Sequence, residues 1–330
     1  MREILNDLFE QKTLDKERAK AILKEIADGK YSECEMASFL TVFCMRPITV
    51  EEFSGFRAIL QELCVRVDLG GIETIDMCGT GGDGKHTINI STLSSFVMAG
   101  AGIKVAKHGN YAVSSGCGSS NVLEALGYKF TSDVSLLKKS IDTAGICFMH
   151  APLFHPAMKA VGPVRRALGV KTFFNSLGPL INPAFPSRQV TGVYNKETAR
   201  LYKYVLEKTA IDFTIIYSLD GYDEISLTSP FLAITKAGEE IISPQDLGLK
   251  QYTHADIAGG STVPEATKIF TNILSGKGSA AQNDVIAINA AYGIKCVKPG
   301  LTIKECMSQA RQSLESGAAR QVLDKLLAVK

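Results

Sequence analysis

The stretch that decides the fold is residues 75–127, IDMCGTGGDGKHTINISTLSSFVMAGAGIKVAKHGNYAVSSGCGSSNVLEALG. Its first apolar run breaks into a glycine turn at residues 79–83, and a helical segment follows. A second apolar run, residues 103–106, ends in Lys107-His108-Gly109-Asn110, and a polar loop at 114–121 opens another helical segment. Two transitions from strand through loop to helix therefore follow each other.

Both loops of this stretch are rich in Gly, Ser, Thr and Asn. Backbone N–H groups at a helix N-terminus form an anion site, because several donors and the positive end of the helix dipole converge there. Two such loops in tandem indicate a ligand with more than one phosphate, bound at the carboxyl ends of the strands. The alternative is that the glycines and serines only make turns and caps.

The region before this stretch, residues 1–70, is predicted to be a small domain made of helices only. Its apolar residues recur at helical spacing, and the alternation typical of strands is absent. Thr49 and Glu52 match a capping box, in which each side chain satisfies a free backbone N–H of the other residue. Gly70-Gly71 marks the predicted end of this domain.

From residue 71 to residue 330 the pattern alternates between strand and helix, which predicts an α/β domain. Strands are expected at 74–77, 103–106, 146–149, 189–193 and 213–217, with an antiparallel hairpin at 231–236 and 240–243. Helices are expected at 92–101, 121–126, 134–143, 155–168, 197–208, 265–274, 282–292 and 303–327. The fold class is therefore α/β, with a mostly parallel central sheet flanked by helices.

Charge and cysteine content narrow the class of protein. The net charge of +2 gives no reason to expect nucleic acid or a membrane surface as partner. The eight cysteines include no Cys-x-x-Cys pair, which indicates reduced thiols and neither a zinc site nor a disulfide framework. The N-terminus is unlike a secretion signal, and no apolar run reaches the ~20 residues that cross a bilayer. We expect a soluble, cytoplasmic protein.

Asp223 and Glu224 are the candidate metal ligands. They follow the predicted strand 213–217 and the turn Asp220-Gly221. Adjacent carboxylates at the end of a strand suit Mg²⁺, which takes oxygen ligands and usually retains substrate phosphates and waters. The alternative is a solvated acidic turn.

A set of motifs in fixed order carries a resemblance over nearly the whole chain. These are GTGGD, NIST, KHGN, SS-x-x-GS-x-x-VLEALG, HPAMKAVGPVRRALG, F-N-x-LGPL-x-NPA and DGYDEIS. In this order they resemble the anthranilate phosphoribosyltransferase family of tryptophan biosynthesis. The resemblance implies a small helical domain packed on a larger α/β domain that binds 5-phosphoribosyl-1-pyrophosphate, with the active site in the cleft. It also implies that a middle segment, here about 155–185, joins the helical side.

The resemblance assigns site residues to positions of this sequence. Asp223, Glu224 and Ser91 match the family's magnesium ligands, with two ions expected per active site. Gly79, Asn110 and Arg165 match the anthranilate-binding positions. An Arg can pair with a carboxylate through two hydrogen bonds, although Arg on a helix is most often solvated or salt-bridged. The positions matching the phosphoribosyl pyrophosphate site are Gly79, Gly82, Asp83, Thr87, Asn89, Ile90, Ser91, Thr92, Lys107, His108, Gly109, Asn110, Ser114, Ser115 and Ser119.

The implied reaction is attack of the anthranilate amine on C1 of 5-phosphoribosyl-1-pyrophosphate, with displacement of pyrophosphate and inversion. The amine is a neutral nucleophile, so neither a strong base nor a covalent intermediate is required. Lys107 is interpreted as a phosphate ligand, and His108 is the one candidate for a positioning or acid–base role. His155, beside Pro156, is interpreted as a capping or packing residue.

A homodimer through the N-terminal helices is also implied. Phe9, Phe39, Phe43 and Phe56 offer more apolar surface than a small helical domain needs.

The sequence departs from the family pattern in the second loop. The common Arg after Lys107-His108-Gly109-Asn110 is Tyr111, and the usual Lys of the following serine-rich run is Gly116, beside Cys117. Two cations are therefore missing from a loop expected to hold phosphates. Two other functions compete with the family activity. A pyrimidine nucleoside phosphorylase would not need the acidic pair, and a nucleic-acid-binding paralogue would need a basic surface.

Overall fold

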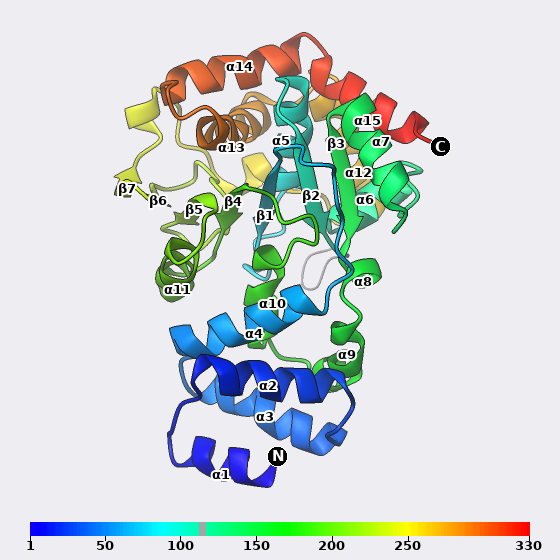
Figure 1. The fold of residues 1–330 in the computed structure, drawn as a ribbon. Helices are drawn as coiled ribbons and strands as arrows, with labels where there is room; N and C mark the ends of the chain where they lie inside the picture. The colour runs from blue at the N-terminus through cyan, green and yellow to red at the C-terminus, as the bar shows by residue number, and fades with distance from the viewer. Residues whose placement is uncertain (112–116) are drawn as a thin grey trace. The chain divides into compact units, whose positions relative to one another are not determined.

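The computed structural model describes residues 1–111 and 117–330, and the chain forms two compact units (Figure 1). The helical unit comprises Met1–Arg66 and Ala151–Pro183, and the α/β unit comprises Val67–His150 and Ala184–Lys330. The middle segment Ala151–Pro183 therefore belongs to the same compact unit as the N-terminal helices.

The helical unit contains no strand in the residues described. Its elements are α1 (Arg2–Phe9), α2 (Lys16–Ala27), α3 (Glu33–Met45), α4 (Val50–Glu62), α8 (Ala151–Phe154), α9 (Ala157–Leu168), α10 (Phe173–Leu177) and the 3-10 turn η1 (Gly178–Leu180). The predicted capping box at the start of α4 is confirmed, because Glu52 N donates to Thr49 Oγ1 at 3.2 Å and Thr49 N donates to Glu52 at 2.9 Å. His155 lies buried between α8 and α9, so the predicted helix 155–168 begins two residues later, at Ala157.

An aromatic cluster fills the centre of the helical unit. Phe56 of α4 stacks on Phe173 of α10 with ring centroids 4.5 Å apart, and Phe39 and Phe43 of α3 meet these rings edge to face. Phe39, Phe43 and Phe56 are therefore core residues, and the expectation that they supply surplus apolar surface is wrong for all three. Only Phe9 of that set is exposed, at 61%.

The α/β unit is built on one seven-stranded sheet with the order β3-β2-β1-β4-β5-β6-β7. The strands are β1 (Ile75–Gly79), β2 (Val105–Gly109), β3 (Ile146–His150), β4 (Arg188–Gly192), β5 (Asp212–Ser218), β6 (Phe231–Thr235) and β7 (Gly238–Ile242). The first five are parallel, and β5, β6 and β7 pair antiparallel. The predicted mostly parallel sheet and the terminal hairpin are both confirmed. Because the chain proceeds outward from β1 through β2 and, on the other side, through β4, the topological switch point lies between β1 and β4.

The helices of the α/β unit follow the predicted order with one correction. They are α5 (Ile90–Gly100), α6 (Ser119–Ala125), α7 (Val134–Ala144), α11 (Lys196–Glu207), α12 (Val263–Leu274), α13 (Ala280–Val297), α14 (Ile303–Glu315) and α15 (Ala318–Ala328), with 3-10 turns η2 (Gln245–Leu247) and η3 (His254–Ile257). The single helix expected at 303–327 is wrong. Gly317 adopts a left-handed conformation, with φ 76°, and the chain breaks there into α14 and α15.

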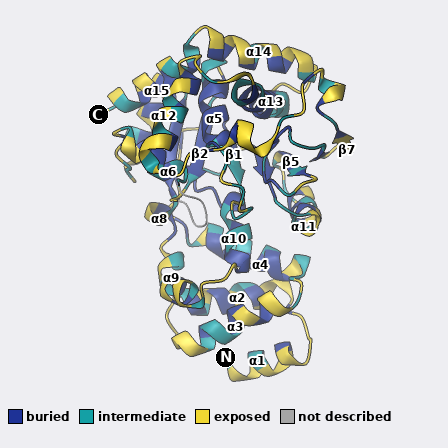
Figure 2. Ribbon diagram, turned by 180° about the vertical axis from the view of Figure 1, so that it is seen from behind, coloured by how far each residue is buried: buried dark blue, intermediate teal, exposed yellow. Residues whose placement is uncertain are grey.

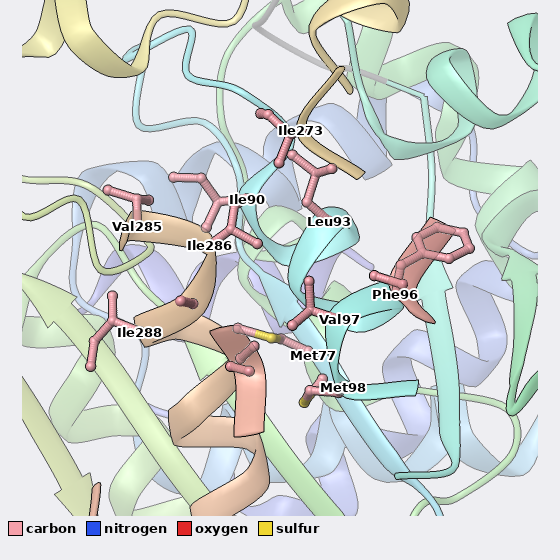
Figure 3. Packing of buried hydrophobic residues seen from close by; sticks show 14 of the residues in the cluster. Met77, Ile90, Leu93, Phe96, Val97, Met98, Ile273, Val285, Ile286 and Ile288 are labelled. Atoms are coloured by element: carbon pink, nitrogen blue, oxygen red, sulfur yellow. The ribbon is translucent and has the colours of Figure 1, made fainter. Parts of the chain in front are cut away.

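Helix α5 lies at the centre of the core of the α/β unit. Leu93, Phe96 and Val97 are buried on it, and Ile286 of α13 and Ile273 of α12 belong to the same cluster (Figure 3). Figure 2 shows α5 and the inner strands mostly in the colour of buried residues, whereas β7 and the outer face of α14 are exposed. Burying so much of α5 fixes its N-terminus beside the end of β1. None of the helices in the described part of the chain has the length and apolar character that crossing a membrane requires.

Candidate active site

The glycine turn after β1 is held against the end of β4. The backbone N–H of Thr80 donates to the carbonyl of Gly192 at 3.0 Å, and the N–H of Lys85 donates to Asp83 at 3.0 Å. Gly81 and Gly82 both have positive φ, which glycine adopts without steric cost. The turn therefore lies at the topological switch point, where ligands of open α/β sheets bind.

The acidic pair Asp223-Glu224 lies beside this turn. Asp223 Oδ2 accepts the backbone N–H of Gly81 at 2.6 Å, and Glu224 Oε1 accepts the backbone N–H of Ser91 at 2.7 Å. Asp223 also approaches Gly79 so closely that a side chain at Gly79 would collide with it. The structure thus brings together four predicted residues from the end of β1, the start of α5 and the segment after β5.

Burial and mutual repulsion set the charge state of the pair. Burial raises the pKa of Asp223 well above its ordinary value, and the negative charges of Glu224 and Asp83 raise it further. Burial likewise raises the pKa of Glu224 to about 7, although the bond from Ser91 and the charge of Lys107 oppose that shift. The pair therefore lies where its ionised form is disfavoured, and a divalent cation would stabilise that form.

Hydrogen bonds from β5 and α13 hold the segment that carries the acidic pair in place. Ser218 Oγ at the end of β5 donates to the carbonyl of Glu224 at 2.7 Å. Asn289 of α13 accepts the N–H of Ile225 at 3.1 Å and donates to its carbonyl at 2.8 Å. Asn289 was missed in the sequence, and its signal was a single amide side chain in the otherwise apolar run 285–291.

The second loop starts at the end of β2. Lys107 is 1% exposed, and its ammonium donates to the carbonyl of Met77 at 2.7 Å. The backbone N–H of His108 donates to the buried Asp76 at 3.2 Å, a contact that the sequence did not indicate. Lys107 therefore lies beneath the end of β1, and its role as a phosphate ligand stays a prediction.

Hydrogen bonds link the two loops. Asn89, just before α5, donates through Nδ2 to the carbonyl of Cys117 at 3.0 Å. The carbonyl of Asn110 accepts Ser119 Oγ and the backbone N–H of Ser120, each at 3.2 Å. Both loops therefore meet near the start of α5.

The remaining predicted residues fall in several places. Thr87 forms an isolated bridge with Ala258, and Ile90 and Thr92 are buried in the first turn of α5. Ser114 and Ser115, and Gly116 of the altered loop, lie outside the described residues.

Arg165 lies on α9 in the helical unit. Its Nη2 donates to Asn175 Oδ1 at 3.4 Å, and its guanidinium carbon lies 5.3 Å from the ring centroid of Phe174. Burial lowers the pKa of Arg165, so the guanidinium is partly removed from water. Among the ion pairs of the described residues none involves Arg165.

Comparison with known families identifies the class of protein. Residues 2–64 match the helical bundle domain of the glycosyl transferase family, and residues 71–320 match its α/β domain. The chain therefore belongs to this class of glycosyltransferases.

Closer relatives identify the particular family. The anthranilate phosphoribosyltransferase of Flavobacterium johnsoniae is 55% identical over 99% of this chain and 98% of the relative. The crystal structure of the Thermus thermophilus enzyme superposes with a TM-score of 0.92 at 31% identity, covering 98% of each chain. The chain belongs to the anthranilate phosphoribosyltransferase family, whose members are pentosyltransferases. The Saccharomyces cerevisiae enzyme in complex with PRPP and Mg superposes with a TM-score of 0.90 at 26% identity, covering 98% of this chain and 95% of that one.

Proposed function

We propose that this chain transfers the phosphoribosyl group of 5-phosphoribosyl-1-pyrophosphate to the amine of anthranilate, in tryptophan biosynthesis. The C1–N bond forms as the C1–O bond to pyrophosphate breaks, with inversion, and the amine loses one proton. The observation that carries the proposal is the pair Asp223 and Glu224, fastened to Gly81 and Ser91 at the carboxyl ends of parallel strands. Such an arrangement suits a substrate whose leaving group is a pyrophosphate.

The donor set of the acidic pair fits Mg²⁺. No group of three or more His, Cys, Asp or Glu side chains in the described residues is arranged to hold a metal by itself. Mg²⁺ is usually bound by one or two carboxylates, with substrate phosphates and waters completing its octahedron. Asp223, Glu224 and Ser91 would hold two ions together with the pyrophosphate. When bound, Mg²⁺ supplies electrostatic stabilisation of the departing pyrophosphate.

The backbone of the glycine turn and the residues that begin α5 are proposed to hold the phosphates. Glycines at 79, 81 and 82 let a phosphate approach the backbone of the turn closely, beside the N–H of Gly81 that Asp223 accepts. Asn89 and Ser91 extend this site with polar side chains, and His108 keeps its assignment as a positioning or acid–base candidate. Fixed donors of this kind stabilise developing negative charge without reorganising during the reaction.

Arg165 is proposed to pair with the anthranilate carboxylate. The guanidinium is partly desolvated and oriented by Asn175 and Phe174, so little freedom is lost on pairing. Asn110 and Gly79 are proposed to contact the same substrate. Holding the amine near C1 supplies the proximity contribution to the rate.

A second copy of the chain is proposed to pack on the N-terminal helices. A groove of about 430 Å³ is lined by residues of α1 and α3, among them Leu8, Phe9 and Met45. Phe9 and Met45 are 61% and 83% exposed. Light scattering of the wild type should report a dimer at micromolar concentration, and Met45→Asp should shift it toward the monomer. A monomeric wild type would contradict this proposal.

The assay that tests the activity is loss of anthranilate fluorescence with 5-phosphoribosyl-1-pyrophosphate, the co-substrate, and Mg²⁺. Fluorescence should fall only when all three components and the protein are present, and a chelator should stop the loss. Unchanged fluorescence at saturating co-substrate and metal would refute the proposal. Cytoplasmic localisation stays a prediction.

A further inference from the structure

Tyr111, which follows Asn110, packs against side chains from β3, from α6 and from the segment after α6. Its ring meets the ring of His150 at the end of β3 edge to face, with centroids 4.8 Å apart, and the ring of Phe130 at 6.4 Å. His150 and Phe130 in turn stack on each other at 4.5 Å. The Tyr111 hydroxyl donates to Glu124 of α6 at 3.2 Å. Tyr111 is thus held at both its ring and its hydroxyl.

The same group is tied to Asn110. His150 is buried, and its Nδ1 lies 2.9 Å from Ser120 Oγ at the start of α6. The backbone N–H of Ser120 donates to the carbonyl of Asn110, and the N–H of Tyr111 donates to Asn110 Oδ1 at 2.8 Å. The ring of Tyr111 is therefore linked through His150 and Ser120 to the backbone of Asn110, in a closed chain of contacts.

We propose that Tyr111 is a positioning residue: its contacts with His150 and Glu124 hold Asn110 against the start of α6, in the place where it meets the aromatic substrate. This inference rests on the proposed function in assigning Asn110 to anthranilate. Tyr111 thereby replaces the expected Arg with a packing contact and contributes through geometry instead of charge.

The direction of the hydroxyl distinguishes this role from phosphate binding. A phosphate ligand at this position needs a donor free to turn toward the phosphate, but the Tyr111 hydroxyl is engaged by the carboxylate of Glu124. A carboxylate at that place would also repel a phosphate. The ring contacts with His150 and Phe130 add roughly the stability of an aromatic pair and fix the side chain in one position.

Thiol labelling tests the positioning role without relying on catalysis. Cys117 lies at the far end of the second loop and is partly buried, whereas Cys34 is exposed on α3 and serves as an internal reference. In Tyr111→Ala, the ratio of Cys117 to Cys34 labelling by a maleimide should rise at least about threefold, the size expected from losing an aromatic contact. Tyr204→Ala, which removes an exposed tyrosine of α11, is the matched control and should leave the ratio unchanged. An unchanged ratio in Tyr111→Ala overturns the proposal.

Two milder variants keep the test decisive if Tyr111→Ala fails to fold. Tyr111→Phe and Glu124→Gln remove or weaken only the hydroxyl contact, so both should raise the labelling ratio by a similar, smaller factor. If Tyr111→Ala does not fold, these two variants decide, and wild-type ratios in both overturn the proposal.

Steady-state kinetics then connects the position of Asn110 to the substrate. Tyr111→Ala should raise the KM for anthranilate at least about fivefold, while the KM for the co-substrate changes less than about twofold. Equal increases in both KM values overturn the role in anthranilate positioning. Absence of turnover in the wild type would instead refute the proposed function, and the labelling result would still stand by itself.

Discussion

Glu52 in the helical unit and the acidic pair Asp223-Glu224 in the α/β unit are both withdrawn from water, but only at Glu52 do the bonds to the carboxylate outweigh its burial. Glu52 of α4 is fully buried, and it accepts backbone N–H groups from Leu14 at 3.0 Å and Thr49 at 2.9 Å and the guanidinium of Arg46 at 3.0 Å. Burial acts to raise the pKa of Glu52, but these bonds outweigh it, and the pKa lies below its ordinary value.

At the acidic pair of the α/β unit, burial outweighs the hydrogen bonds to the carboxylates. Asp223 and Glu224 each accept one backbone N–H, and the pKa of both carboxyls is raised. Burial alone therefore does not decide the direction in which the pKa of a carboxyl is shifted. The difference is that Glu52 pairs with a guanidinium at hydrogen-bond distance, whereas we propose that a metal ion supplies the charge opposite Asp223 and Glu224.

The largest effect is expected from neutralising the acidic pair. Asp223→Asn and Glu224→Gln keep the shape but remove the charge, so kcat/KM should fall about 10²- to 10³-fold, as for loss of a major electrostatic contact. The loss should be greatest at low Mg²⁺. The free energy of unfolding should stay the same or rise, because a buried charge has been removed. Kinetics over a Mg²⁺ titration and denaturant unfolding check both results. Wild-type activity and metal dependence in both variants would mean that the acidic pair holds no metal.

The opposite outcome is expected at Glu52. Glu52→Gln breaks a buried, hydrogen-bonded ion pair with Arg46, so the free energy of unfolding should fall by about 3–5 kcal/mol. Activity per folded molecule should be retained. Glu33→Gln, at an exposed position of α3, is the control and should cost little.

The acid dependence of Glu52 sharpens this test. Because the pKa of Glu52 is lower in the folded chain, its contribution is present above about pH 4.3, the unfolded value, and is lost as the pH falls through the folded pKa. Denaturant unfolding at a series of pH values should therefore show wild type and Glu52→Gln converging in acid. A constant difference down to the lowest pH would mean that Glu52 is not stabilised as a carboxylate.

Arg165 would weaken the contrast between the two units, because a residue of the helical unit would then bind the substrate. Arg165→Ala should raise the KM for anthranilate about 10- to 100-fold, the range for loss of a charged hydrogen bond. The KM for the co-substrate should change little. Arg165→Lys should not restore binding, since an ammonium lacks the planar fork. Arg166→Ala, at the exposed neighbouring position, is the matched control. A larger change in the co-substrate KM would reassign Arg165.

The sequence predicts local structure well and long-range contacts poorly. The positions of the strands and the capping box at Thr49 depend on neighbouring residues, and both are found in the structure. The break at Gly317 was missed because one glycine in a helical pattern is often tolerated.

At the site, the motif residues of the glycine turn could be found from the sequence, because they lie close together in the chain. The contacts of Asp76 with His108 and of Asn289 with Ile225 could not, because they join residues 32 and 64 positions apart. Buried polar partners of this kind are fixed by the sheet order and by helix packing, which no local pattern records.

The smallest effect is expected from restoring a cation to the second loop. In Tyr111→Arg the new guanidinium lies within reach of Glu124, which offsets part of its charge. The KM for the co-substrate should therefore fall by no more than about twofold, near the lower bound for an exposed charge contact. In Tyr111→Arg with Glu124→Gln the decrease should be larger, up to about fivefold. Both decreases should grow at low ionic strength, because screening is weaker there.

The KM for anthranilate should rise in both variants, because the contacts with His150 are lost. Initial rates at two salt concentrations measure all of these changes. A co-substrate KM that is unchanged at both concentrations in both variants would mean that the loop has no need of the missing charge.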